Sequence, residues 1–263
     1  MAQTYNPAVR GRSRTDPLTG LRIAVTGGTR GLGLALVRAA LARGARVALV
    51  ARDPDRVGRV AAATGAHGIV GDVARKEDIH PIALQITGLL GGLDCLVNNA
   101  SSLGSVPLRL LGDTDCEDLE VALATNLVGP FRLTKALLGA LAASARENRG
   151  AVVLNVSSDA AHNPYPGWGA YGASKAALHH LSRIWQEEAS ALGVCFLSLD
   201  PGDMDTELHA LAVPDANRSM LKRPEAAADE LLDAIAHALA KRAARRPRSH
   251  ATDAAAKIQN ALS

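Results

Sequence analysis

The stretch LRIAVTGGTRGLGLALVRAALARG, residues 21–44, decides the fold. An apolar run at 21–26 leads into a glycine-rich turn, and apolar residues then recur at helical spacing up to residue 43. Glycine accepts the tight turn that such a connection needs, and the backbone amides at the start of the helix can bind a phosphate. The stretch therefore predicts a strand, a nucleotide-binding turn and a helix, although the glycines alone also fit an ordinary turn.

The rest of the chain repeats this alternation of strand and helix. Strands are predicted at 45–51, 66–73, 93–100, 151–158 and 194–200, and helices at 54–63, 75–90, 115–145, 170–192 and 224–243. Residues 201–223 are predicted to be a long loop. Six apolar strands separated by helices indicate an α/β fold, in which a parallel sheet is covered on both faces. We expect one domain over 21–245, a flexible leader over 1–20 and a C-terminal tail over 246–263.

Composition and charge exclude several classes of protein. Hydrophobic residues make up 48% of the chain but aromatic residues only 3%, so the core must be aliphatic. No apolar stretch is long enough for a membrane span, and no hydrophobic signal segment begins the chain, so we expect no membrane association. The scattered Cys95, Cys116 and Cys195 suit free thiols in a cytoplasmic protein. Residues 241–248 carry five positive charges, which we interpret as a solvated helix end and not as a nucleic-acid site.

A pair of residues suited to acid–base chemistry lies on the helix predicted at 170–192. Tyr171 and Lys175 are four residues apart, so their side chains share one face of that helix. A phenol is a weak acid at neutral pH, and a nearby ammonium group lowers its pKa. The pair can therefore exchange a proton with an alcohol or a carbonyl group, although the spacing alone also arises by chance.

Three motifs resemble those of the short-chain dehydrogenase/reductase family. Residues 26–33 match its T-G-x-x-x-G-x-G turn, residues 171–175 its Y-x-x-x-K pair, and residues 155–158 its N-x-S-S run. The resemblance implies a Rossmann-like, doubly wound parallel sheet that binds a nicotinamide cofactor at the carboxyl ends of its strands.

Further matches extend the resemblance from residue 26 to residue 206, in family order. Asn126 matches the family's helix asparagine, and Asn98-Asn99-Ala100 its N-N-A-G. The resemblance implies that the cofactor is bound by Gly27, Thr29, Arg30, Gly31, Leu32, Gly33, Arg52, Asp72, Val73, Asn99, Ala100, Tyr171, Lys175, Pro201, Gly202, Met204 and Thr206.

The resemblance also implies the catalytic roles. Tyr171 is expected to be the general acid or base, and Lys175 to lower its pKa and bind the nicotinamide ribose. Ser158 is expected to steady the carbonyl oxygen, with Ser157 as the alternative, and Asn126 to hold a relay water. The expected activity is that of a carbonyl reductase or alcohol dehydrogenase. A nucleotide-sensing or scaffold protein without turnover, and an epimerase or dehydratase, are the alternatives.

The choice of cofactor depends on the end of the second strand. A carboxylate there binds the ribose 2′-hydroxyl of NAD, whereas a basic residue there binds the 2′-phosphate of NADP. This chain has Ala51 at the acidic position, followed by Arg52, and Arg30 lies in the glycine turn. Asp53 comes one residue late for the acidic role. We therefore expect NADP(H), with NAD(H) as the alternative.

The chain departs from the family pattern in two places. Ser101 stands where glycine usually follows Asn-Asn-Ala, and its side chain is expected to crowd or hydrogen-bond near the nicotinamide ribose. Residues 241–263 show no strand pattern, so we expect six strands in the order 3-2-1-4-5-6 and no seventh strand. A homodimer through the helices at 115–145 and 170–192 is therefore expected, and a homotetramer is the alternative.

The substrate is expected to be a small carbonyl compound or alcohol. Ser158 would hold its oxygen, and Tyr165 or Trp168 would contact an apolar part of it. We expect no metal, although Asp203 and Asp205 lie close together in the sequence. Two neighbouring histidines, His179 and His180, are expected on a helix surface.

Overall fold

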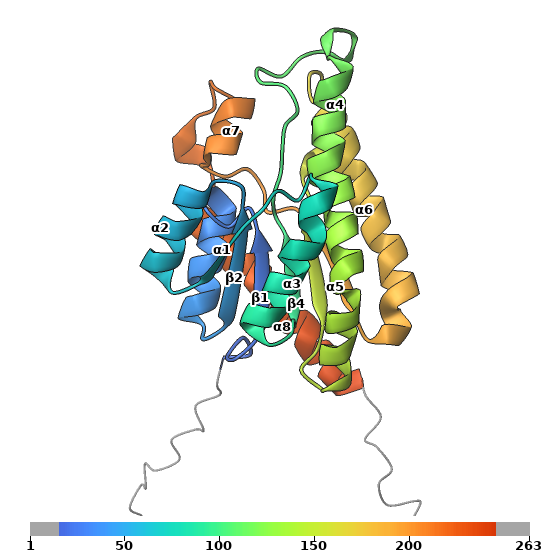
Figure 1. The fold of residues 1–263 in the computed structure, drawn as a ribbon. Helices are drawn as coiled ribbons and strands as arrows, with labels where there is room; N and C mark the ends of the chain where they lie inside the picture. Colours follow the sequence, from blue (N-terminus) through green and yellow to red (C-terminus); the bar gives the residue numbers. More distant parts are fainter. Residues whose placement is uncertain (1–15, 246–263) are drawn as a thin grey trace, which may run out of the picture.

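The computed structural model describes residues 16–245, which form a six-stranded parallel sheet between two layers of helices (Figure 1). The strand order is β3-β2-β1-β4-β5-β6, as predicted. The strands are β1 (Arg22–Thr26), β2 (Arg46–Ala51), β3 (His67–Val70), β4 (Cys95–Asn98), β5 (Val152–Val156) and β6 (Cys195–Leu199). Each predicted strand is present, and each observed strand lies within its predicted range.

The helices pack on the two faces of this sheet. Their bounds are α1 (Gly31–Ala42), α2 (Pro54–Thr64), α3 (Ile79–Leu90), α4 (Cys116–Leu123), α5 (Gly129–Arg146), α6 (Gly169–Ala189), α7 (Glu207–Ala212) and α8 (Pro224–Arg245). A π-helical turn, Ala124–Val128, joins α4 to α5. Side chains of α1 and α8 share one buried cluster, and those of α3 and α5 share the other. The helices α7 and α4 rise beyond the carboxyl ends of the strands (Figure 1).

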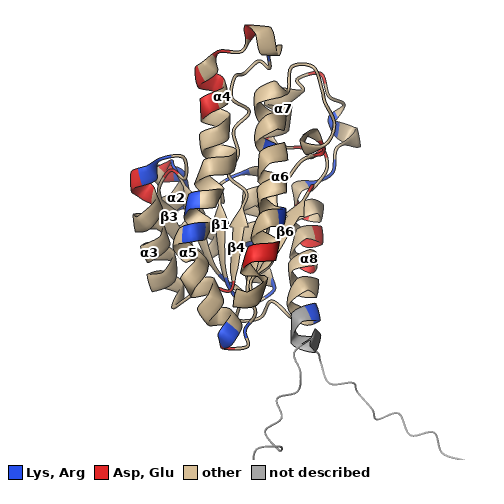
Figure 2. Cartoon of the chain, turned by 90° about the vertical axis from the view of Figure 1, so that its right-hand side faces the viewer, with Lys and Arg blue, Asp and Glu red and all other residues tan. Residues whose placement is uncertain are grey.

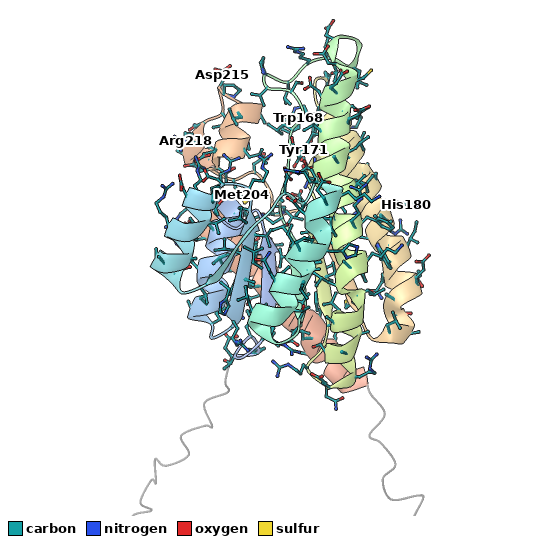
Figure 3. The ribbon with its side chains drawn as sticks, viewed as in Figure 1. Trp168, Tyr171, His180, Met204, Asp215 and Arg218 are labelled. Carbon is teal, nitrogen blue, oxygen red and sulfur yellow. The ribbon has the colours of Figure 1, made fainter. Side chains whose placement is uncertain are left out.

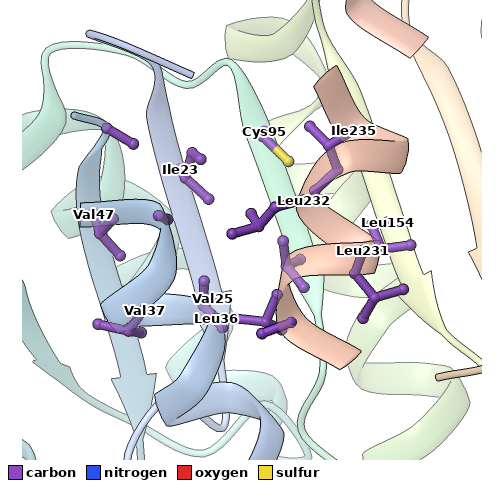
Figure 4. Close-up of a cluster of buried hydrophobic side chains, with 14 of the residues drawn as sticks. Ile23, Val25, Leu36, Val37, Val47, Cys95, Leu154, Leu231, Leu232 and Ile235 are labelled. Carbon is purple, nitrogen blue, oxygen red and sulfur yellow. The ribbon is translucent and has the colours of Figure 1, made fainter. Parts of the chain in front are cut away.

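Alternate residues of the central strands enter opposite clusters, because successive side chains of a strand point to opposite faces. In β1, Ile23 and Val25 pack under α1 and α8, whereas Ala24 packs under α3 and α5. Figure 4 shows the first cluster, where Leu232 and Ile235 of α8 lie over the sheet. Both faces are therefore aliphatic, as the low aromatic content predicts.

Two details of the predicted organisation are wrong. Residues 16–20 do not belong to a flexible leader, because Leu18 is fully buried in the core and Asp16 pairs with Arg43 at 2.9 Å. The expected loop 201–223 contains α7 and a short 3₁₀ turn, Arg218–Met220. The hydroxyl of Thr206 caps α7 by accepting a hydrogen bond from the backbone N–H of His209 at 3.2 Å. Residues 1–15 and the expected tail 246–263 lie outside the described residues.

The surface carries both signs of charge. Figure 2 shows lysine and arginine interspersed with aspartate and glutamate on the helices and loops of the side in view. Among residues 16–245, no helix is both long and apolar enough to cross a membrane.

A buried ion-pair network fastens the end of the sheet opposite the cleft. The carboxylate of Asp94 is fully buried and accepts hydrogen bonds from Arg22 at 2.7 Å, from Arg149 at 3.1 Å and from the Ser144 hydroxyl. Burial alone would raise the pKa of Asp94, but these hydrogen bonds outweigh burial and hold the pKa below its ordinary value of 3.8. The network therefore joins β1 and β4 to the end of α5.

The substitution Asp94→Asn should lower the free energy of unfolding by about 3 kcal/mol at pH 7, because two arginines lose their anion. A native pKa below the unfolded value stabilises the fold above pH 3.8, and this stabilisation is lost as the pH falls further. The difference between the two proteins should therefore shrink in acid. Asp233→Asn removes a more exposed partner of Arg43 and should cost less than about 1 kcal/mol. The free energy of unfolding is measured by urea denaturation, and an equal loss in Asp94→Asn and Asp233→Asn would contradict this ranking.

Candidate active site

A cleft of about 420 Å³ opens at the carboxyl ends of the strands, where parallel α/β sheets bind their ligands. Its walls come from the turn after β1, the ends of β2 to β6, the start of α6 and the helix α7. Figure 3 shows Trp168 and Tyr171 next to each other above the sheet, with Met204 on the side of α7. The rings of Trp168 and Tyr171 are 5.6 Å apart, centroid to centroid.

The glycine turn brings backbone, and not side chains, to the floor of the cleft. Gly27 and Gly31 have φ values of +68° and +50°, which side-chain-bearing residues rarely adopt. A Cβ at Gly33 would lie 2.1 Å from the Gly27 carbonyl oxygen, so α1 packs directly on the turn. The Asn99 side chain donates to the Thr26 carbonyl at 2.9 Å and ties the turn to β4. Together with the N-terminus of α1, these features fit the pyrophosphate of a dinucleotide.

Most of the residues predicted from the sequence meet around this one cleft. Those that line it are Gly27, Thr29, Arg30, Gly31, Leu32, Arg52, Asp72, Val73, Asn99, Ala100, Ser158, Trp168, Tyr171, Lys175, Pro201, Gly202, Met204 and Thr206. Three predicted residues stand behind or beside it. Gly33 packs on the turn, Asn126 is fully buried, and Tyr165 is 44% exposed and donates its hydroxyl to Asp159 at 2.7 Å. Of the two aromatic residues expected as alternatives for substrate contact, Trp168 lines the cleft and Tyr165 lies outside its wall, 6.4 Å from Trp168 between ring centroids.

The helix α6 presents Tyr171 and Lys175 towards the end of β5. The Nζ of Lys175 donates to the Val156 carbonyl at 2.8 Å and lies 5.5 Å from the centroid of the Tyr171 ring. The Ser158 hydroxyl donates to Asp159 at 3.1 Å, and hydrogen bonding with Ser158 lowers the pKa of the Tyr171 phenol. The hydroxyl of Ser157, the alternative to Ser158, is buried and has no hydrogen-bond partner among the described residues. The structure thus places Ser158 at the phenol.

Burial dominates the protonation of the Tyr171–Lys175 pair. Burial raises the pKa of Tyr171 to about 12, and hydrogen bonds with the hydroxyls of Ser158 and Ser101 offset part of this rise. Burial also lowers the pKa of Lys175 to about 8, against the opposing effect of the Asp200 carboxylate. The expectation that Lys175 lowers the pKa of Tyr171 is therefore not confirmed in this geometry, where the ammonium group bonds to Val156 instead.

The predicted asparagine lies in the π-helical turn between α4 and α5. In a regular α-helix the Asn126 carbonyl would accept from residue 130, but Pro130 has no N–H, which favours the wider turn. The Asn126 amide donates to the Ser102 carbonyl and to the Ser174 hydroxyl, both at 2.8 Å. Asn126 therefore joins the loop after β4 to α6, directly behind the cleft.

The far end of the cleft carries three arginines. Arg52 follows β2, is 72% exposed and lies 3.9 Å from Asp72. Asp53 caps α2 by accepting from the backbone N–H of Arg56 at 3.0 Å, and its other oxygen pairs with the Arg56 guanidinium at 3.3 Å. Arg30 pairs with Glu207 of α7 at 2.7 Å. Asp53 thus serves as the N-cap of α2. This structural role is the alternative to binding the ribose of a cofactor.

The cleft wall also contains residues that no sequence motif marked individually. Leu103, Leu208 and Ala212 form an apolar patch with the predicted Trp168, and the unmarked polar residues of the wall include Asp159 and His209. Leu208 and His209 belong to α7, which is too short to show periodicity. Ser101 had a visible signal, its departure from the glycine of the family pattern.

Of the remaining candidates, Asp203 lines the cleft, whereas His179, His180 and Asp205 do not. His180 is exposed on the outer side of α6 (Figure 3), whereas His179 is half-buried against His162 and the Ser198 hydroxyl, which corrects its expected surface position. Asp205 pairs with Arg218 at 2.7 Å, and Asp203 lies 3.7 Å from His209. In the part of the chain that is described, no three His, Cys, Asp or Glu side chains are arranged to hold a metal ion.

Comparisons with known proteins agree with this geometry. The profile of a family described as short chain dehydrogenase matches residues 22–217. Carbonyl reductase family member 4 of Xenopus tropicalis is 32% identical over 186 residues, which cover 70% of this chain and 76% of that protein. Serine 3-dehydrogenase of Agrobacterium fabrum is 32% identical over 188 residues, which cover 70% of this chain and 72% of that protein. Among solved structures, the crystal structure of 3-ketoacyl-(acyl-carrier-protein) reductase from Brucella melitensis complexed with NADH has a TM-score of 0.76 at 23% sequence identity. The match covers 82% of this chain and 90% of that chain, and it supports the fold.

The substitution Gly33→Ala should weaken dinucleotide binding by about tenfold or more, because its Cβ displaces the Gly27 carbonyl and with it the turn. Gly58→Ala in α2 is the matched control, since a Cβ there meets nothing within 4 Å. Quenching of protein fluorescence by NADPH and by NADH measures both affinities. An affinity of Gly33→Ala equal to that of Gly58→Ala would show that the turn does not hold the dinucleotide.

Proposed function

This chain belongs to the short-chain dehydrogenase family, and we propose that it is an NADP(H)-dependent oxidoreductase acting on a ketone or a secondary alcohol. The observation that carries the proposal is the meeting of Tyr171, Lys175 and Ser158 in the wall of one cleft, opposite the glycine turn. The carbonyl reductase and serine dehydrogenase among the relatives support an activity at C=O or CH–OH groups.

The chain's own residues account for the proton chemistry. When bound, a nicotinamide cofactor supplies or accepts the hydride. The Ser158 hydroxyl exchanges its bond to Asp159 for one to the substrate oxygen, which it stabilises as negative charge develops. Tyr171 gives its proton to that oxygen in reduction and takes it back in oxidation. With a pKa of about 12, the phenol holds its proton at pH 7, the state that carbonyl reduction needs.

The other predicted residues complete the proposal. The glycine turn would hold the pyrophosphate, and Lys175 and Asn99 would face the nicotinamide ribose. Asn126 would support a relay from Lys175 to solvent, because it fixes the loop and the helix on either side. Trp168 would contact an apolar part of the substrate, since it belongs to the patch with Leu103, Leu208 and Ala212.

We propose NADP(H) as the preferred cofactor. Arg52 follows the second strand at the edge of the cleft, where an exposed guanidinium can bind a 2′-phosphate. Asp53, the acid that would favour NAD(H), is committed to capping α2. Arg30 would have to leave Glu207 to contribute, so Arg52 carries most of the preference.

The expected homodimer also stays a prediction, together with the cytoplasmic location. Val121, Phe131 and Ile184 are exposed apolar side chains on α4, α5 and α6, the helices through which we expect two chains to pair. A dimer through these helices would cover these side chains.

The substitution Tyr171→Phe should lower kcat by about 100-fold or more, because the phenol supplies the proton. Screening ketones and alcohols by the absorbance of NADPH supplies the substrate for the assay. NADPH should still bind to the variant, which separates lost chemistry from lost folding. Turnover above about a tenth of wild type would contradict the role of Tyr171. Binding of NADPH without turnover of any compound by the wild-type protein would favour the nucleotide-sensing alternative.

The substitution Arg52→Ala should raise KM for NADPH by about tenfold, because a charged hydrogen bond to the phosphate is lost, and leave KM for NADH nearly unchanged. Arg59→Ala, an exposed arginine further along α2, is the control and should change neither constant. Equal or better use of NADH by the wild-type protein would overturn the preference for NADP(H).

A further inference from the structure

Ser101 places a second hydroxyl beside the Tyr171 phenol, at the position where the sequence departs from the glycine pattern. It follows β4 and lines the cleft together with Tyr171. Its Oγ donates to the Oδ1 of Asn126 at 3.2 Å, and hydrogen bonding with Ser101 lowers the pKa of the Tyr171 phenol. Ser101 therefore lies between the proposed general acid and the buried asparagine behind it.

The Asn126 oxygen does not depend on Ser101 for its hydrogen bonding. The backbone N–H of Ser102 donates to the same Oδ1 at 2.8 Å, a shorter bond than that of Ser101. The amide nitrogen of Asn126 is held by Ser102 and Ser174. Asn126 is thus fixed by three bonds that do not involve Ser101, and the loss of the fourth leaves no buried acceptor without a donor.

The other polar neighbours of Tyr171 have different tasks. In the proposed reaction the Ser158 hydroxyl turns to the substrate oxygen, and the Nζ of Lys175 donates to the Val156 carbonyl. The hydroxyl of Ser101 can turn to the phenol oxygen by giving up only its hydrogen bond to Asn126. It breaks no hydrogen bond to the substrate and leaves no buried carbonyl without a donor.

We propose that Ser101 stabilises the phenolate of Tyr171 by rotating its O–H from Asn126 to the phenol oxygen when Tyr171 gives up its proton. The inference rests on the proposed function. No proton is gained or lost by Ser101. The phenolic O–H bond breaks as its proton passes to the substrate oxygen, and the hydroxyl of Ser101 replaces one acceptor, Asn126 Oδ1, by another, the phenolate. In alcohol oxidation the same steps run in reverse.

Other charged groups also act on Tyr171 and must stay constant in a test. They are Lys175 on the same helix, Asp159 after β5 and Asp200 after β6. Substitution of Ser101 removes none of them. Any change in the titration of Tyr171 can therefore be attributed to the lost hydroxyl if the fold and these groups are retained.

The titration of Tyr171 can be followed without turnover, because the chain has only three tyrosines. Fluorinated tyrosine, which ionises at lower pH, replaces all three, and Tyr171→Phe identifies the ¹⁹F signal of Tyr171. The variants Ser101→Ala and Ser101→Gly should raise the midpoint of that signal by about one pH unit, a tenfold loss of phenolate. Ser101→Thr keeps the hydroxyl and should retain the wild-type midpoint. Ser105→Ala, a serine in the same loop outside the cleft wall, is the control.

The pH profile of alcohol oxidation gives the second readout. Its rising limb should move upward in Ser101→Ala and Ser101→Gly by the same amount as the ¹⁹F midpoint, and Ser101→Thr should restore it. An unchanged midpoint, or a change confined to the affinity for NADPH, would overturn the inference and leave Ser101 as a cofactor contact. A shifted midpoint in a protein that turns over no alcohol or carbonyl compound would instead refute the proposed function and keep the role of Ser101 towards the phenol.

Discussion

The packing of Gly33 on the Gly27 carbonyl is the constraint on which the rest of the site depends. A Cβ at residue 33 would stand 2.1 Å from that oxygen, so only glycine lets α1 begin directly above the end of β1. This contact brings the N-terminus of α1 to the crevice between β1 and β4, where the strand order reverses. Asn99 then ties the turn to β4, and Ser101 follows two residues later. The proposed dinucleotide site and the environment of Tyr171 thus share one anchoring point.

Most of the fold could be predicted because a parallel sheet is buried on both faces, so that its strands are recognisable as apolar runs between helices. What could not be predicted depends on contacts distant in the sequence. The helix α7 has six residues, too few for periodicity, and the distant pair Arg30–Glu207 joins it to the turn after β1. Leu18 is a single apolar residue in a polar segment, and nothing near it in the sequence indicates that the core covers it.

The candidate site shows the same division between what is local and what is not. The spacing of Tyr171 and Lys175 predicts their shared helix face, but their protonation depends on burial, which the surrounding elements decide together. The family pattern favours Ser158 over its neighbour Ser157, and the different surroundings of the two hydroxyls become visible only in the three-dimensional structure. The sequence marks Ser101 as unusual. That it reaches both Tyr171 and Asn126 depends on how the loop after β4 packs against the π-helical turn.

The hydrogen bonds around Tyr171 limit how the proposed reaction can proceed. Ser158, Ser101 and Lys175 each have a protein partner, so the charge that develops on the substrate or on the phenol must be met by an exchange of partners. An exchange costs little only where the abandoned partner stays satisfied or exposed. Asp159 is exposed and also accepts from Tyr165, and Asn126 keeps the Ser102 N–H. The abandoned carbonyl of Val156 would be buried, so Lys175 is the least free to exchange. The two serine hydroxyls can therefore change partners most easily. Ser158 would stabilise negative charge on the substrate oxygen, and Ser101 would stabilise it on the phenol oxygen.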